Sequence, residues 1–136
     1  MLIVDDEPDV MLMLRVNLEA DGYETVLAAD GERALEKIDS DAPDIVLLDV
    51  MMPVMDGWGV LEALTRRPSG PPVVILSARS GARDIERAIG LGAVDCLAKP
   101  FELDEVSRTI EAVLASSPEE LDARRHATVA RAVGGA

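Results

Sequence analysis

The sequence predicts an α/β protein in which helices cover both faces of a doubly wound, five-stranded parallel sheet. Five short apolar runs that are rich in β-branched residues alternate with segments in which apolar residues recur at helical spacing. Such alternation predicts right-handed strand–helix–strand crossovers and therefore parallel strands. The runs at 45–48 and 73–76 contain no polar residue, which is typical of strands buried on both faces.

The predicted elements follow one another along most of the chain. Expected strands lie at residues 2–4, 23–27, 45–48, 73–76 and 93–97, and expected helices include residues 10–18, 34–38, 60–64, 85–89 and 106–114. Turn-forming Asp-Gly pairs and a Ser-Gly-Pro-Pro stretch separate several of these segments, at 21–22, 30–31, 56–57 and 69–72. The chain is therefore predicted to repeat a strand–helix unit five times.

Length and composition indicate one folded domain with a short appendage. The 136 residues are 49% apolar and 29% charged, which is enough apolar material for a core. Residues 1–115 form the predicted domain, and a break in the pattern leaves 116–136 as a tail or linker. Leu121, Val129 and Val133 could share one helix face as a linker or dimer contact, although a frayed tail is favoured.

Charge and residue types exclude several classes of function. The net charge of −13 opposes contact with polyanions, so no direct nucleic-acid partner is expected. No apolar run approaches the ~20 residues that cross a bilayer, so we expect a cytoplasmic protein without a membrane partner. The single cysteine is Cys96, and the single histidine, His126, lies in the tail. The main domain therefore lacks the residues for Ser-His-Asp catalysis, histidine metal sites or CxxC redox chemistry.

Polar residues follow four of the predicted strands at the point where each strand ends. They are Asp5, Asp6, Glu7, Asp49, Ser77 and Lys99. Ligands of an open parallel sheet bind beyond the carboxyl ends of its strands, so we expect these side chains to converge. Clustered carboxylates raise one another's pKa unless a cation lies among them, and oxygen ligands with room for water suit Mg²⁺. The sequence therefore predicts a magnesium site.

The same residues suit phosphoryl transfer. Mg²⁺ can hold a phosphoryl oxygen while Lys99 supplies a positive charge and Ser77 supplies a hydrogen-bond donor. Since no histidine or suitable cysteine is near, a carboxylate is the available nucleophile, and Asp49 at the end of a buried strand is the best candidate. Taken singly, each residue is more often part of a solvated turn or a helix cap. Their coincidence at successive strand ends favours a functional site.

Several motifs stand in order along residues 1–115. They are LIVDDEP at 2–8, PDIVLLDVMMP at 43–53, DG at 56–57, SA at 77–78, GA at 92–93 and KPF at 99–101. With these motifs the chain resembles the receiver domain of bacterial two-component response regulators. The resemblance implies a flavodoxin-like fold with strand order 2-1-3-4-5, a fold that includes receiver proteins.

The resemblance also implies a phosphorylation-controlled switch. Asp49 would be the phosphoacceptor, supplied by a sensor histidine kinase or a histidine phosphotransfer protein. Lys99 would pair with the phosphoryl group, Ser77 would donate a hydrogen bond to it, and the bond from Lys99 to Pro100 would be cis. The output would reach a downstream protein partner or a missing output domain. A homodimer through the fourth helix, fifth strand and fifth helix is a further possibility.

For the metal, the resemblance implies a Mg²⁺ site with both direct and indirect ligands. Asp6, Asp49 and the backbone carbonyl of Met51 would bind Mg²⁺ directly, and Asp5 would act through a bound water. Two bulky side chains, those of Met51 and Arg79, stand two residues beyond Asp49 and Ser77. They should obstruct the hydrolytic water, which predicts slow self-dephosphorylation.

One residue departs from the family pattern. Receivers usually carry a tyrosine or phenylalanine three residues before the lysine, and here that position is Cys96. A cysteine cannot fill the same pocket, so movement of Ser77 should be transmitted differently. A small core side chain is favoured over a reactive thiol at this position.

Two alternatives to the switch stay open. An aspartyl-phosphate phosphatase typically needs a second aspartate two residues after the nucleophile, where this chain has Met51. A phosphorylation-independent scaffold is favoured only by Cys96. In the leading hypothesis the protein is not an enzyme with a separate substrate, because it catalyses only its own phosphorylation and dephosphorylation.

Overall fold

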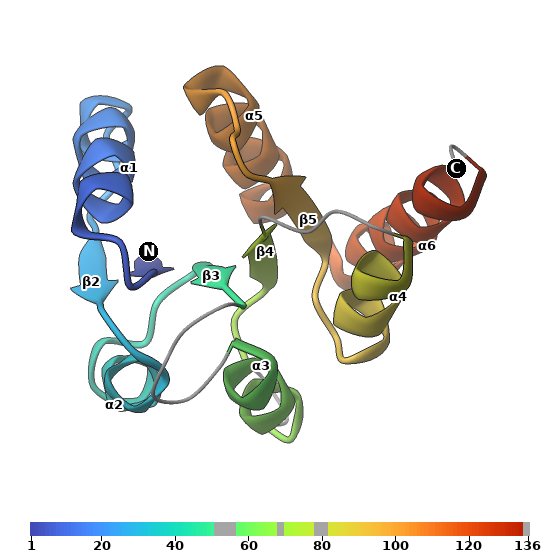
Figure 1. The fold of residues 1–136 in the computed structure, drawn as a ribbon, viewed down its shortest axis with the longest axis horizontal. Coiled ribbons are helices and arrows are strands. Elements are labelled where there is room, and N and C mark those ends of the chain that lie inside the picture. Colours follow the sequence, from blue (N-terminus) through green and yellow to red (C-terminus); the bar gives the residue numbers. More distant parts are fainter. Residues whose placement is uncertain (51–56, 68–69, 78–81, 135–136) are drawn as a thin grey trace.

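Strands and helices alternate along the computed structural model, which describes residues 1–50, 57–67, 70–77 and 82–134 (Figure 1). In chain order the elements are β1 (Leu2–Val4), α1 (Pro8–Ala20), β2 (Val26–Ala28), α2 (Gly31–Asp41), β3 (Val46–Asp49), α3 (Gly57–Thr65), β4 (Val73–Ser77), α4 (Ala82–Gly90), β5 (Asp95–Ala98), α5 (Leu103–Leu114) and α6 (Pro118–Gly134). The strands pair in parallel in the order β2-β1-β3-β4-β5. The predicted fold class and strand order are confirmed.

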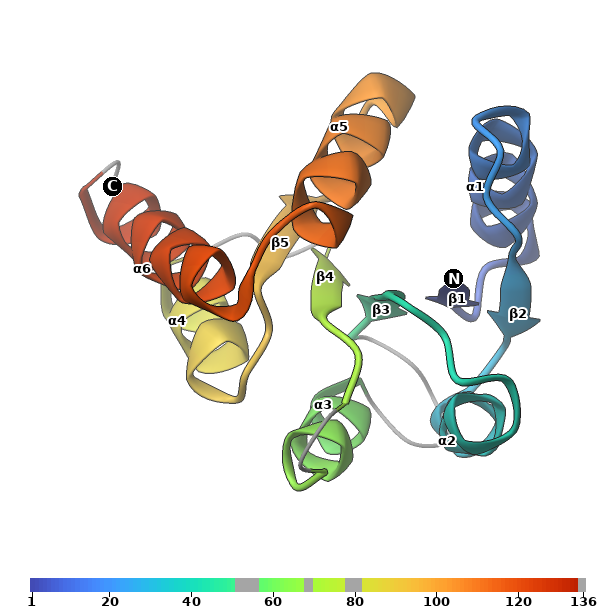
Figure 2. The same cartoon turned by 180° about the vertical axis from the view of Figure 1, so that it is seen from behind.

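Two hydrophobic cores lie on opposite faces of the sheet (Figures 1 and 2). The helices α1 and α5 cover one face, and α2, α3 and α4 cover the other. Successive side chains of a strand point to opposite faces of the sheet. In β1, Leu2 and Val4 therefore join the core beneath α2, α3 and α4, whereas Ile3 joins the core beneath α1 and α5. Leu47 and Leu48 of β3 divide in the same way. Burial on both faces explains why these strands are uninterrupted apolar runs.

Proline, glycine and aspartate residues mark the ends of the first two helices. Pro8 occupies the first turn of α1, where its missing N–H has no helical partner to lose. After α1, Gly22 has φ +97°, a conformation that glycine adopts without a steric penalty. Asp30 caps α2, because its Oδ1 accepts a hydrogen bond of 2.9 Å from the backbone N–H of Arg33.

Two strands begin two or three residues later than predicted. The N–H of Tyr23 donates to the carbonyl of Leu18 at 3.1 Å, and the N–H of Ala93 donates to the carbonyl of Ala88 at 3.0 Å. Both residues therefore complete the end of the preceding helix before the chain enters β2 or β5. Their apolar side chains pack in the cores without belonging to a strand.

The favoured frayed tail is wrong for residues 118–134, which form α6 and pack against α4 and β5. Ser117 and Glu120 form a capping box: the N–H of Glu120 donates to Ser117 Oγ at 3.2 Å, and the N–H of Ser117 donates to Glu120 Oε1 at 3.1 Å. The division of the chain after residue 115 stays a prediction. Among the described helices, α6 included, none is long and apolar enough to span a membrane.

The core position of Leu47 gives a test of the fold. Leu47 is fully buried in the central strand β3, whereas Leu12 on α1 is 59% exposed. We expect Leu47→Ala to lower the free energy of unfolding by about 2–5 kcal/mol, because it leaves a cavity between sheet and helices. Leu12→Ala should change it by less than about 0.5 kcal/mol. Urea unfolding followed by circular dichroism measures both, and equal losses would contradict the burial of Leu47.

Candidate functional site

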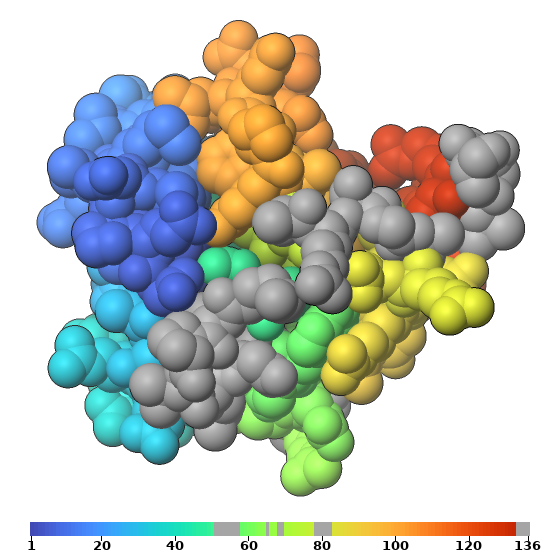
Figure 3. All heavy atoms as spheres, viewed as in Figure 1, coloured from blue at the N-terminus to red at the C-terminus, as the bar shows by residue number. Residues whose placement is uncertain are grey.

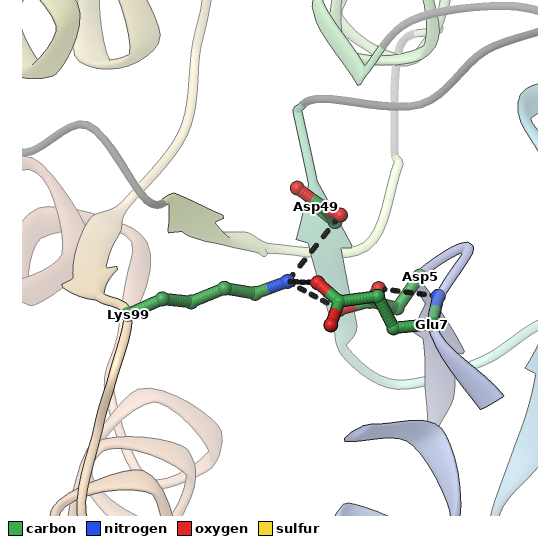
Figure 4. Close-up of polar contacts among 4 residues, drawn as sticks. All are labelled: Asp5, Glu7, Asp49 and Lys99. Atoms are coloured by element: carbon green, nitrogen blue, oxygen red, sulfur yellow. Dashed lines mark hydrogen bonds and ion pairs between the residues drawn. The ribbon is translucent and has the colours of Figure 1, made fainter. Parts of the chain in front are cut away.

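The polar residues at the carboxyl ends of the strands meet at one edge of the sheet. Asp5 follows β1, Asp49 ends β3, and Ser77 ends β4. Since β3 pairs with both β1 and β4, these residues come from three adjacent strands. Lys99 follows β5, and its N–H donates to the carbonyl of Ser77 at 2.7 Å. Figure 4 shows the Lys99 side chain extending toward Asp5, Glu7 and Asp49.

The Lys99 ammonium lies among three carboxylates. It donates to Asp5 Oδ2 at 2.8 Å, and it lies 3.3 Å from Glu7 Oε1 and 3.4 Å from Asp49 Oδ2. The other oxygen of Asp5, Oδ1, accepts a 2.9 Å hydrogen bond from the N–H of Glu7. The peptide bond from Lys99 to Pro100 is cis, as the resemblance implies. Lys99 therefore connects the end of β5 to the ends of β1 and β3.

Neighbouring charges control the ionisation of Lys99. Burial favours its neutral form, but the hydrogen bond to Asp5 and the negative charges of Asp5 and Asp49 outweigh burial and raise the pKa of Lys99. Because the folded-state pKa of Lys99 is raised, the contribution of the charged side chain to the free energy of unfolding is complete below the pKa of an unfolded lysine. That contribution is lost as the pH rises through the folded-state value. Lys99 is therefore charged at neutral pH.

Four carboxylates lie close enough together to hold one cation. An oxygen from each lies within 4.8 Å of the others, and the residues are Asp5, Asp6, Glu7 and Asp49. Asp5 is fully buried and Asp49 is 3% exposed, whereas Asp6 and Glu7 are exposed. Lys99 offsets one of the four negative charges. A cluster of hard oxygen donors with exposed members that leave room for water fits Mg²⁺.

The structure brings together most of the predicted site. Glu7 is one of the acids expected at this edge but is absent from the Mg²⁺ ligands that the resemblance implies, and it contacts Lys99 and belongs to the carboxylate cluster. The signal was present in the sequence, since three acids in succession follow β1. The predictions for the carbonyl of Met51 and for the side chain of Arg79 lie outside the described residues.

Cys96 lines a cavity beside Ser77. The cavity has a volume of about 200 Å³, and its described walls also include Trp58 of α3 and Ile85 of α4. The Arg87 guanidinium lies over the Trp58 ring, 4.2 Å from its centroid. Cys96 therefore borders an open space next to Ser77.

The Cys96 thiol is held in its protonated form. Burial, together with the negative charge of Asp95, raises the pKa of Cys96 to about 12. The thiolate is the reactive species, so at neutral pH this side chain is a poor nucleophile. Its environment favours the small core side chain over the reactive thiol.

The fold and the site define a class of protein: doubly wound α/β domains with an acidic cluster and a lysine at the carboxyl ends of the strands. A model of the response regulator receiver domain matches residues 1–111, and the chain belongs to this family. The matched segment ends before α6 begins at Pro118.

Individual relatives agree with the family assignment. The chain is 39% identical over 116 residues to the alkaline phosphatase synthesis transcriptional regulatory protein PhoP of Bacillus subtilis, a match that covers 85% of this chain and 48% of PhoP. It is 41% identical over 113 residues to the transcriptional regulatory protein PrrA of Mycobacterium tuberculosis, covering 83% of this chain and 48% of PrrA. The chain thus spans about half the length of these relatives.

Solved structures resemble the fold closely. A putative response regulator from Chloroflexus aurantiacus superposes with a TM-score of 0.80 at 36% identity, covering 85% of this chain and 96% of that protein. The chemotaxis protein CheY4 of Vibrio cholerae superposes with a TM-score of 0.77 at 31% identity, covering 82% of this chain and 95% of that one.

The raised pKa of Cys96 predicts slow alkylation. In native protein at pH 7.5 we expect iodoacetamide to modify Cys96 on the order of a thousandfold more slowly than a free thiol, because so little thiolate is present. Intact mass spectrometry over time measures the rate, and the same protein in urea supplies the unburied reference. Equally rapid alkylation of native and unfolded protein would revive the reactive-thiol hypothesis.

The carboxylate cluster predicts opposite effects of one substitution with and without Mg²⁺. Asp49→Asn removes one of the clustered negative charges, so without divalent ions it should raise the free energy of unfolding by on the order of 1 kcal/mol. In millimolar Mg²⁺ the variant should gain less stability than the wild type, because one ligand is lost.

Urea unfolding in chelator and in Mg²⁺ measures both effects. The exposed acid Asp44 lies before β3, at the opposite end of that strand from Asp49, so Asp44→Asn is the matched control. An Asp49→Asn protein that gains as much stability from Mg²⁺ as the wild type would show that Asp49 is not a ligand.

Proposed function

We propose that the chain is a phosphorylation-controlled switch in which Asp49 accepts a phosphoryl group from a phosphohistidine. The observation that carries this proposal is the Asp49 carboxylate itself, almost fully buried at the end of β3, with the Lys99 ammonium 3.4 Å from its Oδ2. The proposal is supported by the cluster of carboxylates that includes Asp49 and by membership of the receiver family. The phosphoryl donor would be a sensor histidine kinase or a histidine phosphotransfer protein.

The proposed reaction is a direct phosphoryl transfer. A carboxylate oxygen of Asp49 attacks the phosphorus atom, and the bond from phosphorus to the histidine nitrogen breaks, with its electron pair returning to the imidazole. The product is an acyl phosphate on Asp49. Asp5, Asp6, Asp49 and the carbonyl of Met51 would hold Mg²⁺, and Glu7 lies close enough to contribute. The bound ion would neutralise negative charge on the carboxylates and on the phosphoryl oxygens.

Lys99 and Ser77 would then respond to the new group. The Lys99 ammonium would exchange its contacts with Asp5 and Glu7 for a phosphoryl oxygen, since the doubly charged group attracts it more strongly. The Ser77 hydroxyl would donate a hydrogen bond to another phosphoryl oxygen. Because the N–H of Lys99 is bonded to the carbonyl of Ser77, the ends of β4 and β5 would adjust together. Such an adjustment biases a two-state equilibrium that partners can sense.

The proposal also covers the catalysis, the cellular location and the downstream partner of the switch. The chain would catalyse its own phosphorylation and dephosphorylation and would act on no separate substrate. It would work in the cytoplasm, where a kinase can reach it, and would signal to a downstream protein or to an output domain. The named relatives PhoP and PrrA are transcriptional regulators about twice as long as the matched segment, which makes an output domain in a longer protein a reasonable partner.

Incubation with acetyl phosphate and Mg²⁺ tests the chemistry. We expect intact-protein mass spectrometry to show the addition of one phosphoryl group, because a small acyl phosphate can replace the phosphohistidine as donor. The addition should disappear in Asp49→Ala and in the presence of a chelator. Asp44→Ala, which removes an exposed acid at the opposite end of the same strand, should be phosphorylated like the wild type.

The same experiment separates the switch from a scaffold. A folded protein that gains stability from Mg²⁺ and yet takes up no phosphoryl group would favour the phosphorylation-independent scaffold. Uptake that persists in Asp49→Ala would place the acyl phosphate on another carboxylate.

A further inference from the structure

The last helix covers a surface formed by α4 and β5. In Figures 1 and 2, α6 runs beside α4 and next to β5, and both contacts are present in the structure. The space-filling view of Figure 3 places the red α6 and the yellow α4 on the same side of the molecule. Residues 115–117 are the only link between α5 and α6. A short link of this kind holds α6 close to the surface that it covers.

A buried carboxylate on β5 anchors α6. Asp95 is 5% exposed, and its Oδ2 accepts a hydrogen bond from Arg124 Nε at 2.9 Å and forms an ion pair with Arg124 Nη2 at 2.7 Å. Its Oδ1 accepts from Thr128 Oγ1 at 3.2 Å and from the N–H of Cys96 at 2.8 Å. Three of these four polar contacts come from α6. Both Arg124 nitrogens therefore lie against one oxygen of Asp95, and the charged guanidinium strengthens this contact.

Other contacts fix the orientation of α6. Leu121, one turn before Arg124, packs against the hydrophobic core beneath α1 and α5. Arg125 Nη2 donates to the carbonyl of Gly92 at 3.4 Å, in the turn between α4 and β5. Leu121, Arg124 and Thr128 are three and four residues apart, so they lie along one face of the helix. This face combines one apolar, one cationic and one hydroxyl side chain.

We infer that the surface formed by α4 and β5 is a binding site for an amphipathic helix that carries an arginine and, four residues later, a threonine, and that α6 occupies it within the same chain. The buried Asp95 carboxylate makes the site selective, because leaving that charge without a cation is strongly unfavourable. The partner that fits in trans is α6 of a second copy, since it presents the same side chains. Any partner that uses this surface must first displace the resident helix.

The effective concentration of a tethered helix explains why the site is closed in the intact chain. A segment joined by a short link is present at its site at a concentration in the millimolar range. An isolated peptide of the same sequence is only marginally helical in water and binds weakly. A peptide therefore reaches the site only after the resident α6 has been made unable to dock.

The test uses the full chain with one charge reversed. In Arg124→Glu, the new carboxylate faces Asp95 and should release α6. The matched control is Arg108→Glu, the same charge change at an exposed residue of α5. Hydrogen exchange should show α6 amides exchanging roughly 30-fold faster or more in Arg124→Glu than in the wild type or Arg108→Glu. Amide signals from β1 and β3 report whether each variant stays folded.

Binding in trans is measured by nuclear magnetic resonance on the isotopically labelled full chain. An unlabelled peptide of residues 116–134 is titrated to a few millimolar, in the range of the tethered helix. We expect saturable shifts of α4 and β5 amides in Arg124→Glu and none in the wild type or Arg108→Glu. A peptide with the Arg124→Glu change should shift none of the three proteins.

Three results would overturn the inference. The first is that hydrogen exchange finds the α6 amides equally protected in Arg124→Glu and in the wild type. The second is that the wild type and Arg124→Glu bind the peptide equally well. The third is that the peptide causes no shifts in an Arg124→Glu protein whose α6 has been released. If Arg124→Glu loses the β1 and β3 signals, Arg124→Ala replaces it as the host, with the same expected and contrary results. Arg108→Ala is then the control.

Discussion

The geometry of the acidic site depends on one ammonium group placed among buried carboxylates. Asp5 and Asp49 are almost inaccessible to water, so their charges are not screened by solvent and need positive charge nearby. Lys99 supplies part of it by reaching from the end of β5 across to the ends of β1 and β3. The remaining acidic charge fits a cation, and in the proposed function that cation would in turn attract an anionic group.

The parallel sheet is what makes this arrangement possible. Strands that run in the same direction present all their carboxyl ends at one edge, and both faces of the sheet are sealed by helices packed on separate cores. The main chain at the edge is therefore held firmly, while its side chains meet at the open end. Residues 90 or more positions apart in the sequence, such as Asp5 and Lys99, are brought within hydrogen-bonding distance.

The sequence is most informative where a local pattern and the packing agree. Buried strands are apolar throughout because both faces are covered, so their number could be predicted from the pattern, whereas their order in the sheet came from the resemblance to receiver domains. The pattern predicts strand positions for Tyr23 and Ala93 because an apolar residue that ends a helix looks the same as one that begins a strand. The docking of α6 could not be predicted from hydrophobic periodicity, because Arg124 and Thr128 bind through polar contacts. Glu7 was expected at this edge, but its contact with Lys99 depends on a side-chain direction that spacing alone does not give.

Strand β5 joins two ionic contacts that lie at its opposite ends. Asp95 at its start holds the last helix, and Lys99 just after its end reaches into the acidic site. The two residues are four positions apart, which in an extended strand is about 13 Å. An extended backbone resists stretching, and β5, as an edge strand, has a single neighbouring strand to fix its position. The backbone of one short strand therefore links the acidic site to the surface that α6 covers.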